Sequence, residues 1–217
     1  MFGSANVAFA EESGGFVGIG IGGGGTELSG SGYDDTEGNF DDKLKFSGIN
    51  YGFVVGYKQF FNEYLGLRYY ASLDIHHNLS KEYGFNVDEF GNDILERSDI
   101  TLINYGVNVD FLGNFVVTEI ADFGGFIGVG IGGNTIKGKY FKDMELGVTD
   151  SKFKYTGFDV WLNLGLHTNI AKYHGIELVA RVPFMPVKLV DYTYETGSVK
   201  YTFGQKYNIL ARYTFSF

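Results

Sequence analysis

Apolar and polar residues alternate over long stretches of this chain, which is the pattern of β-strands that have two unlike faces. Between residues 48 and 61, the odd positions from Ile49 to Tyr57 are all apolar or aromatic, whereas the even positions include Asn50 and Lys58. The same alternation recurs over residues 65–76, 101–111, 158–167, 176–184 and 201–217. The pattern therefore predicts six strands, each with one apolar and one largely polar face.

A repeated glycine-rich segment predicts two more strands. GGFVGIGIGGGGT at 14–26 recurs as GGFIGVGIGGNTI at 124–136, with glycines at alternate positions and Val, Ile or Phe between them. Residues 18–23 also fit the G-x-G-x-x-G spacing of a dinucleotide-binding loop, but such a loop opens a helix, and no helical period follows it here. We interpret both segments as strands with one bare face, and their recurrence is consistent with a duplication.

Long and short connections alternate between the eight predicted strands, so that all long loops fall at one end. The long loops are expected at residues 23–47, 78–99, 134–154 and 187–200. This alternation is typical of membrane barrels with short periplasmic turns and long extracellular loops. The predicted fold class is all-β, an eight-stranded antiparallel up-and-down transmembrane β-barrel.

The charged residues of the six alternating strands all fall on the polar face. They are Lys58, Arg68, Asp74, Asp110, Asp159, Glu177, Arg181, Lys206 and Arg212. A Lys or Arg that faces lipid near the midplane costs about 2–4 kcal/mol, so this face is expected to line the lumen. Since eight strands leave an interior that side chains just fill, we expect a lumen charge network. A narrow gated ion path is the alternative, and a soluble barrel would reverse the two faces.

Composition narrows the classes of protein further. The chain has no cysteine, so disulfides and Cys-ligated metals are excluded, and its net charge of −9 argues against nucleic acid as a partner. No uninterrupted apolar run is long enough for a transmembrane helix.

Residues 1–10 end in Ala-Phe-Ala, which is typical of a signal-peptide cleavage site, although an ordinary apolar N-terminus would look similar. We therefore expect a signal-peptide remnant at 1–10 and one barrel domain at 11–217.

The last residues, YNILARYTFSF, place Tyr213, Phe215 and Phe217 on one face of the final predicted strand. This ending resembles the terminal signal by which the barrel-assembly machinery recognises bacterial outer-membrane barrels. The resemblance implies that these three aromatic residues form an assembly signal.

Five segments are distinctive as a set. They are GLRYYASLDIHHN at 66–78, LINYGVNVDFLGNFV at 102–116, FGGFIGVGIGGNT at 123–135, HGIELVARVPFMP at 174–186 and YNILARYTFSF at 207–217. Together they resemble the Helicobacter-type outer membrane proteins of ε-proteobacteria. The resemblance implies a location in the bacterial outer membrane, in contact with its lipid and lipopolysaccharide. The family includes both porins and host-cell adhesins, so it leaves the function open.

The candidate chemistry does not favour an enzyme. Ser72, Asp74 and His76 share a face, but alternate residues of a strand lie about 7 Å apart, too far for direct proton transfer. We expect no metal or other cofactor.

Loops 23–47 and 78–99 each hold six acidic and two basic residues. One interpretation is that these charges serve only to keep the loops solvated. Alternatively, they bridge to lipopolysaccharide through divalent cations or bind a host or matrix surface. The expected function is a structural or surface-interaction role, with a narrow channel second and a lipid-acting enzyme third.

Overall fold

The computed structural model describes residues 13–35, 38–79, 82–87, 93–97, 99–146, 153–195 and 197–217. The expected signal-peptide remnant at 1–10 lies outside the described residues. The strands are β1 (Gly14–Asp34), β2 (Gly38–Phe60), β3 (Leu65–Asn78), β4 (Glu82–Val87), β5 (Asp93–Arg97), β6 (Thr101–Val117), β7 (Ala121–Lys137), β8 (Thr156–Ile170), β9 (His174–Pro183), β10 (Val187–Tyr194) and β11 (Gly197–Ser216). One helix, α1, covers Lys139–Leu146.

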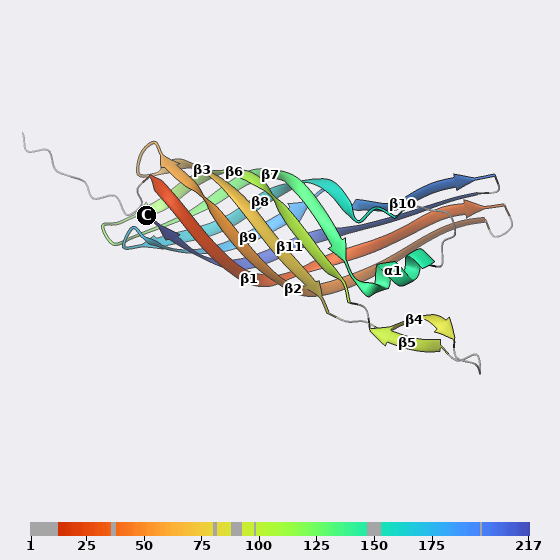
Figure 1. Cartoon of the computed structure of the whole chain (residues 1–217). Helices are drawn as coiled ribbons and strands as arrows, with labels where there is room; N and C mark the ends of the chain where they lie inside the picture. Colours follow the sequence, from red (N-terminus) through yellow and green to blue (C-terminus); the bar gives the residue numbers. More distant parts are fainter. Residues whose placement is uncertain are drawn as a thin grey trace, which may run out of the picture.

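Eight antiparallel strands close into a barrel (Figure 1). The order around the ring is β1-β2-β3-β6-β7-β8-β9-β11, and β11 pairs back onto β1 from Phe16 opposite Ser216 to Asp34 opposite Gly197. β10 adds to the outer part of β11, and β4 pairs with β5 in a separate hairpin. The predicted fold class is confirmed.

The two ends of the barrel differ. The connections β2–β3, β6–β7 and β8–β9 are short and lie at the end that also holds the C-terminus (Figure 1). There the Phe217 N–H donates to the Gly15 carbonyl oxygen at 2.9 Å, which joins the two ends of the barrel sheet. The opposite end carries α1, β10, the β4–β5 hairpin and the long β1–β2 hairpin. Because short turns face the periplasm in outer-membrane barrels, we assign this opposite end to the extracellular side.

Two of the expected long loops are largely β-structure. β1 and β2 continue through most of residues 23–47, and the segment 187–200 contains β10 and the start of β11. Residues 39–45 of β2 are exposed at every position, so neither face of the strand is buried there. The period-two pattern that reveals a strand in sequence requires one buried face, and for that reason it did not mark this extension.

The barrel is apolar outside and polar inside. Large hydrophobic side chains such as Ile19, Val107 and Ile176 are more than half exposed on the outer wall, whereas Asn50, Asn163 and many charged residues are buried inside. This arrangement suits a wall that contacts lipid, and it is the reverse of a soluble barrel.

The glycine repeat of β7 makes room for large side chains in the lumen. A Cβ atom at Gly130 would overlap the Trp161 indole, and one at Gly128 would overlap the Asp110 carboxylate. Since β7 pairs with β8 through Gly130 opposite Trp161, the bare face of one strand accommodates the bulk of the next.

Candidate functional site

The centre of the lumen is an ion network organised by Arg68 of β3. Its guanidinium donates to Asp110 at 2.7 Å from Nη2 and to Glu177 at 2.5 Å from Nη1, and all three side chains are buried. Asp110 lies directly opposite Arg68 on the neighbouring strand β6, but Glu177 is on β9, across the barrel. Arg212 of β11 donates to the second Glu177 oxygen at 3.3 Å. The network therefore crosses the lumen instead of only following its wall.

A second ion pair crosses the same interior. Arg181 of β9 pairs with Asp74 of β3, and its Nε donates to Asn163 at 3.1 Å. The Asn163 amide also donates to Tyr70 and Asp110, which links this pair to the Arg68 network. The Arg181 guanidinium lies 5.0 Å from the centre of the Trp161 ring, a cation–π distance. Side chains from β3, β6, β8 and β9 thus fill the lumen at this level.

Lys58 and Asp159 complete the expected charges that lie inside. The Lys58 ammonium donates to Asn169 at 3.2 Å, and Asp159 accepts from Asn134 at 2.8 Å and from the Met185 backbone N–H at 3.0 Å. The structure also buries Asp122 in the lumen, beside Asn169. Sequence reasoning missed Asp122 because it precedes the glycine repeat, although it shares the parity of the bare glycine face.

The prediction for Lys206 is wrong, because its side chain lies outside the lumen. The side chain is 59% exposed and pairs with Glu27 at 2.9 Å. The pairing of β1 with β11 skips Lys206, since Gly25 lies opposite Tyr207 and Thr26 opposite Gln205. Such a bulge inverts the parity of a strand. As a result Gln205 and Phe203 are buried, although an unbroken alternation from Phe217 would place these odd positions on the outer face.

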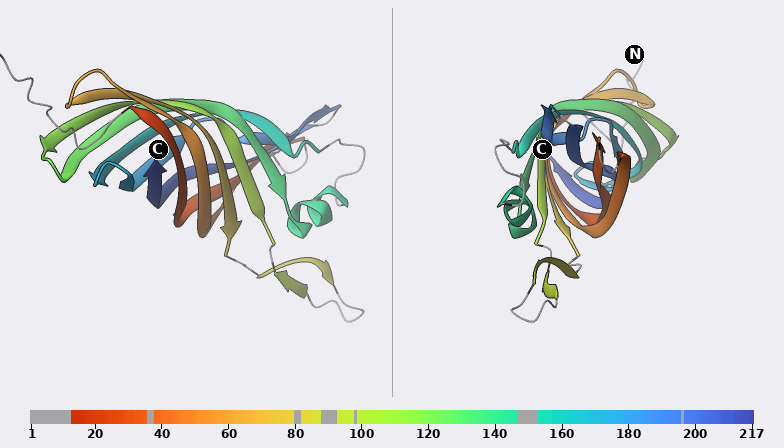
Figure 2. Two further views of the ribbon diagram at one scale, coloured as in Figure 1. Left: turned by 60° about the vertical axis from the view of Figure 1, so that its left-hand side comes forward. Right: turned by 90° about the vertical axis from the view of Figure 1, so that its right-hand side faces the viewer.

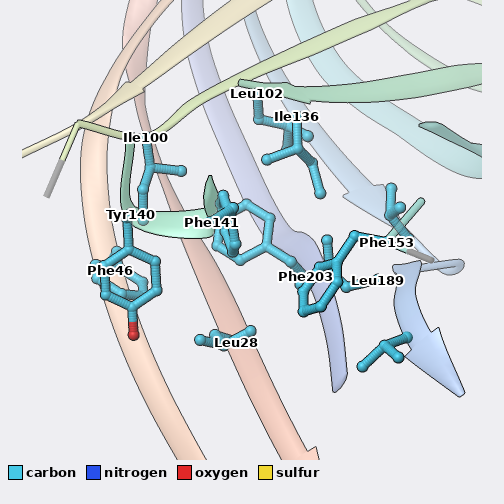
Figure 3. Packing of buried hydrophobic residues seen from close by; sticks show 12 residues of the cluster. Leu28, Phe46, Ile100, Leu102, Ile136, Tyr140, Phe141, Phe153, Leu189 and Phe203 are labelled. Atoms are coloured by element: carbon cyan, nitrogen blue, oxygen red, sulfur yellow. The ribbon is translucent and has the colours of Figure 1, made fainter. Parts of the chain in front are cut away.

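A hydrophobic cluster closes the extracellular end of the lumen (Figure 3). Barrel strands contribute Leu28, Phe46, Leu102, Ile136 and Phe203, and the segments above them contribute Ile100, Tyr140, Phe141, Phe153, Val187, Leu189 and Val190. Phe141 of α1 is fully buried, and its ring lies 5.1 Å from that of Phe203. Burial raises the pKa of Tyr140 in the same cluster. Sequence reasoning gave no signal for this cap, because its members come from seven separate segments.

The lumen is therefore closed at two levels, by ion pairs in the middle and by the cap above them. A water-filled pore needs a continuous polar path, and the cap interrupts any such path with aromatic and aliphatic side chains. Among the described residues, side chains fill the middle and the mouth of the barrel, whereas the buried amides of Asn50 and Asn208 have no protein partner.

The residues weighed as catalytic do not form a reactive group. The Ser72 hydroxyl accepts from Asn108 at 3.0 Å, Asp74 pairs with Arg181, and His76 contacts Asn78 at 3.1 Å. No hydrogen bond joins any two of these three side chains in the structure. Within the described ranges, His, Asp and Glu side chains also form no cluster that would hold a metal ion.

Above the cap, four strands continue as an extracellular sheet, ordered β2-β1-β11-β10. Figure 2 shows these strands and α1 at the extracellular end, with the β4–β5 hairpin projecting separately. Tyr33, Phe40, Leu44 and Tyr192 are exposed on this sheet. In the part of the chain that the structure describes, no helix is long and apolar enough to span a membrane.

These features define the protein as an integral β-barrel of the bacterial outer membrane. A family model described as Helicobacter outer membrane protein matches residues 52–217, and the chain belongs to this family. The predicted family and the predicted location are confirmed. No curated protein sequence matches the chain.

Solved structures with a similar course of the chain share little sequence with it. Neisserial surface protein A is 13% identical, with a TM-score of 0.46 over 95% of this chain and 100% of that one. OprG from Pseudomonas aeruginosa is 13% identical, with a TM-score of 0.49 over 95% and 97%. Ail of Yersinia pestis, the attachment invasion locus protein, is 16% identical, with a TM-score of 0.32 over 92% and 99%.

Proposed function

We propose that this protein is a non-enzymatic outer-membrane barrel with a structural and surface-interaction role, carried by the extracellular sheet of β1, β2, β10 and β11. One contrast supports the proposal. The lumen is filled by side chains, whereas the sheet continues well beyond the barrel and exposes both of its faces along residues 39–45. We therefore place the contact on the sheet.

The sheet is long enough to stand clear of the lipid surface. Beyond Glu27, which lies at the level of the first charged residues, β1 continues to Asp34. At about 3.4 Å per residue this segment covers roughly 25 Å along the strand. A loop that only joined two strands would not need such a paired, regular extension.

The surface chemistry of the sheet fits a protein partner. Tyr33, Phe40 and Leu44 are large and exposed, and Asp41 and Asp42 lie among them. Aromatic residues are enriched in the centres of protein interfaces, and charged residues surround them at the rim. We infer that a host or matrix protein surface is the partner, as adhesin-like contact requires.

The contact is expected to use side chains and not strand addition. Among the described residues, no strand pairs with the outer edge of β2 on the extracellular side of Gly48, where its pairing with β3 begins. This edge carries Asp41, Lys43 and Lys45, and charges on an edge strand oppose pairing with a further strand. The side chains of this edge thus remain available for contact, while its charges oppose aggregation through strand pairing.

A narrow channel is the second candidate, and one observation favours it. The side-chain amides of Asn50 and Asn208 are buried beside the glycine-rich wall of β1, and neither has a hydrogen-bond partner in the described part of the chain. Buried amides of this kind are commonly satisfied by water, so this part of the lumen suits hydration. Passage of an ion would still require displacement of the hydrophobic cap.

Two further partners follow from the outer wall. Its apolar band contacts outer-membrane lipid, including lipopolysaccharide on the extracellular side. Tyr213, Phe215 and Phe217 are exposed on that wall near the periplasmic end, where the barrel-assembly machinery would recognise them during insertion.

The test is to shorten the β1–β2 hairpin. Residues 29–43 are replaced by Asn-Gly, which forms a tight hairpin turn between the paired residues Leu28 and Leu44. Cells that display the protein should then lose adherence to host cells and to immobilised matrix proteins. The barrel should still fold and shift with heat on a gel, because surface extensions contribute little to barrel stability.

A point variant and a matched control make the test sharper. Tyr33→Ser with Phe40→Ser removes two exposed aromatic rings from the sheet, whereas Phe61→Ser with Phe115→Ser removes two from the periplasmic end of the barrel, one in the β2–β3 turn and one in β6. We expect reduced adherence only from the first pair. Adherence that survives the hairpin replacement, or large steady conductance from the purified protein, would contradict the proposal.

A further inference from the structure

The barrel wall contains a gap in backbone pairing between β9 and β11. β11 pairs with β9 up to Asn208 opposite Arg181, and its pairing with β10 begins at Phe203 opposite Val187. Residues 204–207 of β11 therefore have no partner strand on this side among the described residues, although most of them pair with β1 on the other side. Unpaired backbone groups in a membrane barrel are tolerated only where water or protein reaches them.

The chain between β9 and β10 turns away from β11 at this gap. Residues 183–186 are Pro-Phe-Met-Pro, and neither proline has an N–H group to donate to a neighbouring strand. Phe184 instead donates its backbone N–H to the Val160 carbonyl oxygen of β8 at 2.9 Å. Pro186 lies against the bare outer face of Gly204, where an added Cβ atom would be 2.9 Å from it. The segment thus leaves the wall and passes over its outer surface.

A buried carboxylate holds this segment in place. Asp159 of β8 is fully buried, and its Oδ1 accepts from the backbone N–H groups of Phe184 at 3.3 Å and Met185 at 3.0 Å. Its Oδ2 accepts from the Asn134 amide at 2.8 Å. A carboxylate is costly to bury unless hydrogen bonds compensate it. The gap is therefore fixed by a specific set of bonds and is not the frayed end of a strand.

A cavity of about 60 Å³ lies at the gap. Its lining includes Pro183, Pro186, Glu27 and Gln205. Since Glu27 is the first charged residue of β1, the cavity opens at the extracellular edge of the apolar wall. Roughly 10–15 Å³ is enough to hold one water molecule, so the cavity has room for several. Gln205 also reaches the lumen, because its side-chain amide nitrogen lies 3.5 Å from Nδ1 of His76.

The lumen behind Gln205 is polar, and it lies on the periplasmic side of the hydrophobic cap. His76 Nε2 contacts the Asn78 side-chain oxygen at 3.1 Å, and Asn50 lies opposite His76 on the neighbouring strand β2. The amides of Asn50 and Asn208 are buried without a hydrogen-bond partner among the described residues. These amides can therefore bond to a molecule that enters through the gap.

We propose that the gap between β9 and β11 is a lateral portal, through which water and small uncharged polar molecules enter the lumen from the membrane surface. This route bypasses the cap, which closes the axial path. A charged group loses much of its hydration in so narrow a passage, and that loss is expensive without compensation, so the portal excludes ions. Entry through the wall is independent of the proposed surface-interaction role of the extracellular sheet.

The experiment measures entry with a cysteine reporter, which is unambiguous because the chain has no cysteine of its own. The full-length Gln205→Cys variant is refolded into lipid vesicles and treated with methyl methanethiosulfonate, which is small and uncharged, or with an analogue that carries a trimethylammonium group. Each rate is divided by the rate of the same reagent at the exposed control Ser31→Cys. The normalised rate of the uncharged reagent should exceed that of the charged one at least tenfold. Equal normalised rates would overturn the proposal.

A second substitution tests whether the reagent enters through the wall. Ser29 lines the cavity, so Ser29→Trp should fill it from the outside and slow the uncharged reagent at the Gln205→Cys reporter at least fivefold. The matched control is Ser31→Trp, which adds the same ring two residues further along the same face of β1, outside the cavity. The rate in this control should stay within twofold of the rate without it.

Two results would show that the route is not lateral. A rate that Ser29→Trp leaves unchanged but Phe141→Ala raises would mean that the reagent enters through the cap. An equal loss with Ser31→Trp would mean that the added ring acts without closing the cavity. Asn208→Cys, deeper in the lumen, is the second reporter and should give the same pattern. All variants are first checked for the heat-dependent gel shift of the folded barrel.

Discussion

Glu177 accepts from two arginines in the lumen, so its loss should destabilise the barrel far more than the loss of an exposed carboxylate. Glu177→Gln keeps the side-chain shape but removes the charge that Arg68 and Arg212 share at 2.5 and 3.3 Å. Breaking a buried ion pair costs about 3–5 kcal/mol. Arg68 keeps Asp110 as a partner at 2.7 Å, whereas Arg212 keeps no carboxylate partner among the described residues. We therefore expect a loss of about 3 kcal/mol in the free energy of unfolding, the lower end of that range.

Trp161 makes the measurement direct. It is the single tryptophan of the chain and is fully buried in the lumen beside Arg181. Its fluorescence should report unfolding in a urea titration of the protein in lipid vesicles. The matched control, Asp41→Asn, removes a carboxylate whose pairing with Lys43 is 3.6 Å long and exposed. This change should alter the free energy of unfolding by less than about 0.5 kcal/mol.

A double variant separates loss of charge balance from loss of packing. Glu177→Gln with Arg212→Met removes the uncompensated cation as well, and buried ion pairs can often be replaced by hydrophobic side chains at little cost. The double variant should therefore regain part of the stability. A loss below about 1 kcal/mol for Glu177→Gln, or the same loss for Asp41→Asn, would refute the view that the lumen network holds the barrel together.

Three other predictions follow from the packed interior and the chain end. Gly130→Ala should prevent refolding in vesicles because its Cβ atom would overlap Trp161, whereas Gly113→Ala, with open space around it, should refold like wild type. Phe141→Ala should loosen the hydrophobic cap, at a cost of about 3–5 kcal/mol for a buried phenylalanine. Conductance steps in a planar bilayer should then become more frequent than the rare, small steps expected of wild type, and identical traces would contradict a closed mouth. Deletion of Phe217 should lower the amount of folded protein in the outer membrane, and Phe184→Ala, an exposed aromatic elsewhere on the barrel, should not; equal membrane levels in both would count against a terminal assembly signal.

The sequence by itself determined the barrel and its orientation of faces. Successive residues of a barrel strand face lipid and lumen in turn, so they must be apolar and polar in turn. The alternation of residues such as Ile49 and Asn50 therefore predicts the barrel from local sequence. The glycine repeats also predicted strands correctly. Their alternate glycines leave one face of β7 without side chains, and the Trp161 indole occupies that space. The terminal aromatic residues and the family motifs also needed only local sequence.

The tertiary structure decided what alternation cannot encode. A single bulged residue, Lys206, inverts the parity of the outer part of β11 and places Phe203 inside, and no local pattern marks where a bulge falls. Residues 39–45 of β2, in the extracellular sheet, could not be recognised as a strand because they are exposed on both faces and therefore lack the period of two. Two lumen ion pairs, Arg68 with Glu177 and Arg181 with Asp74, join strands that are not neighbours, so only closure of the barrel brings these partners together. The hydrophobic cap depends on closure in the same way. Tyr140 and Phe141 of α1 contact Phe46 and Phe203 only when separate segments of the chain come together at the mouth of the barrel.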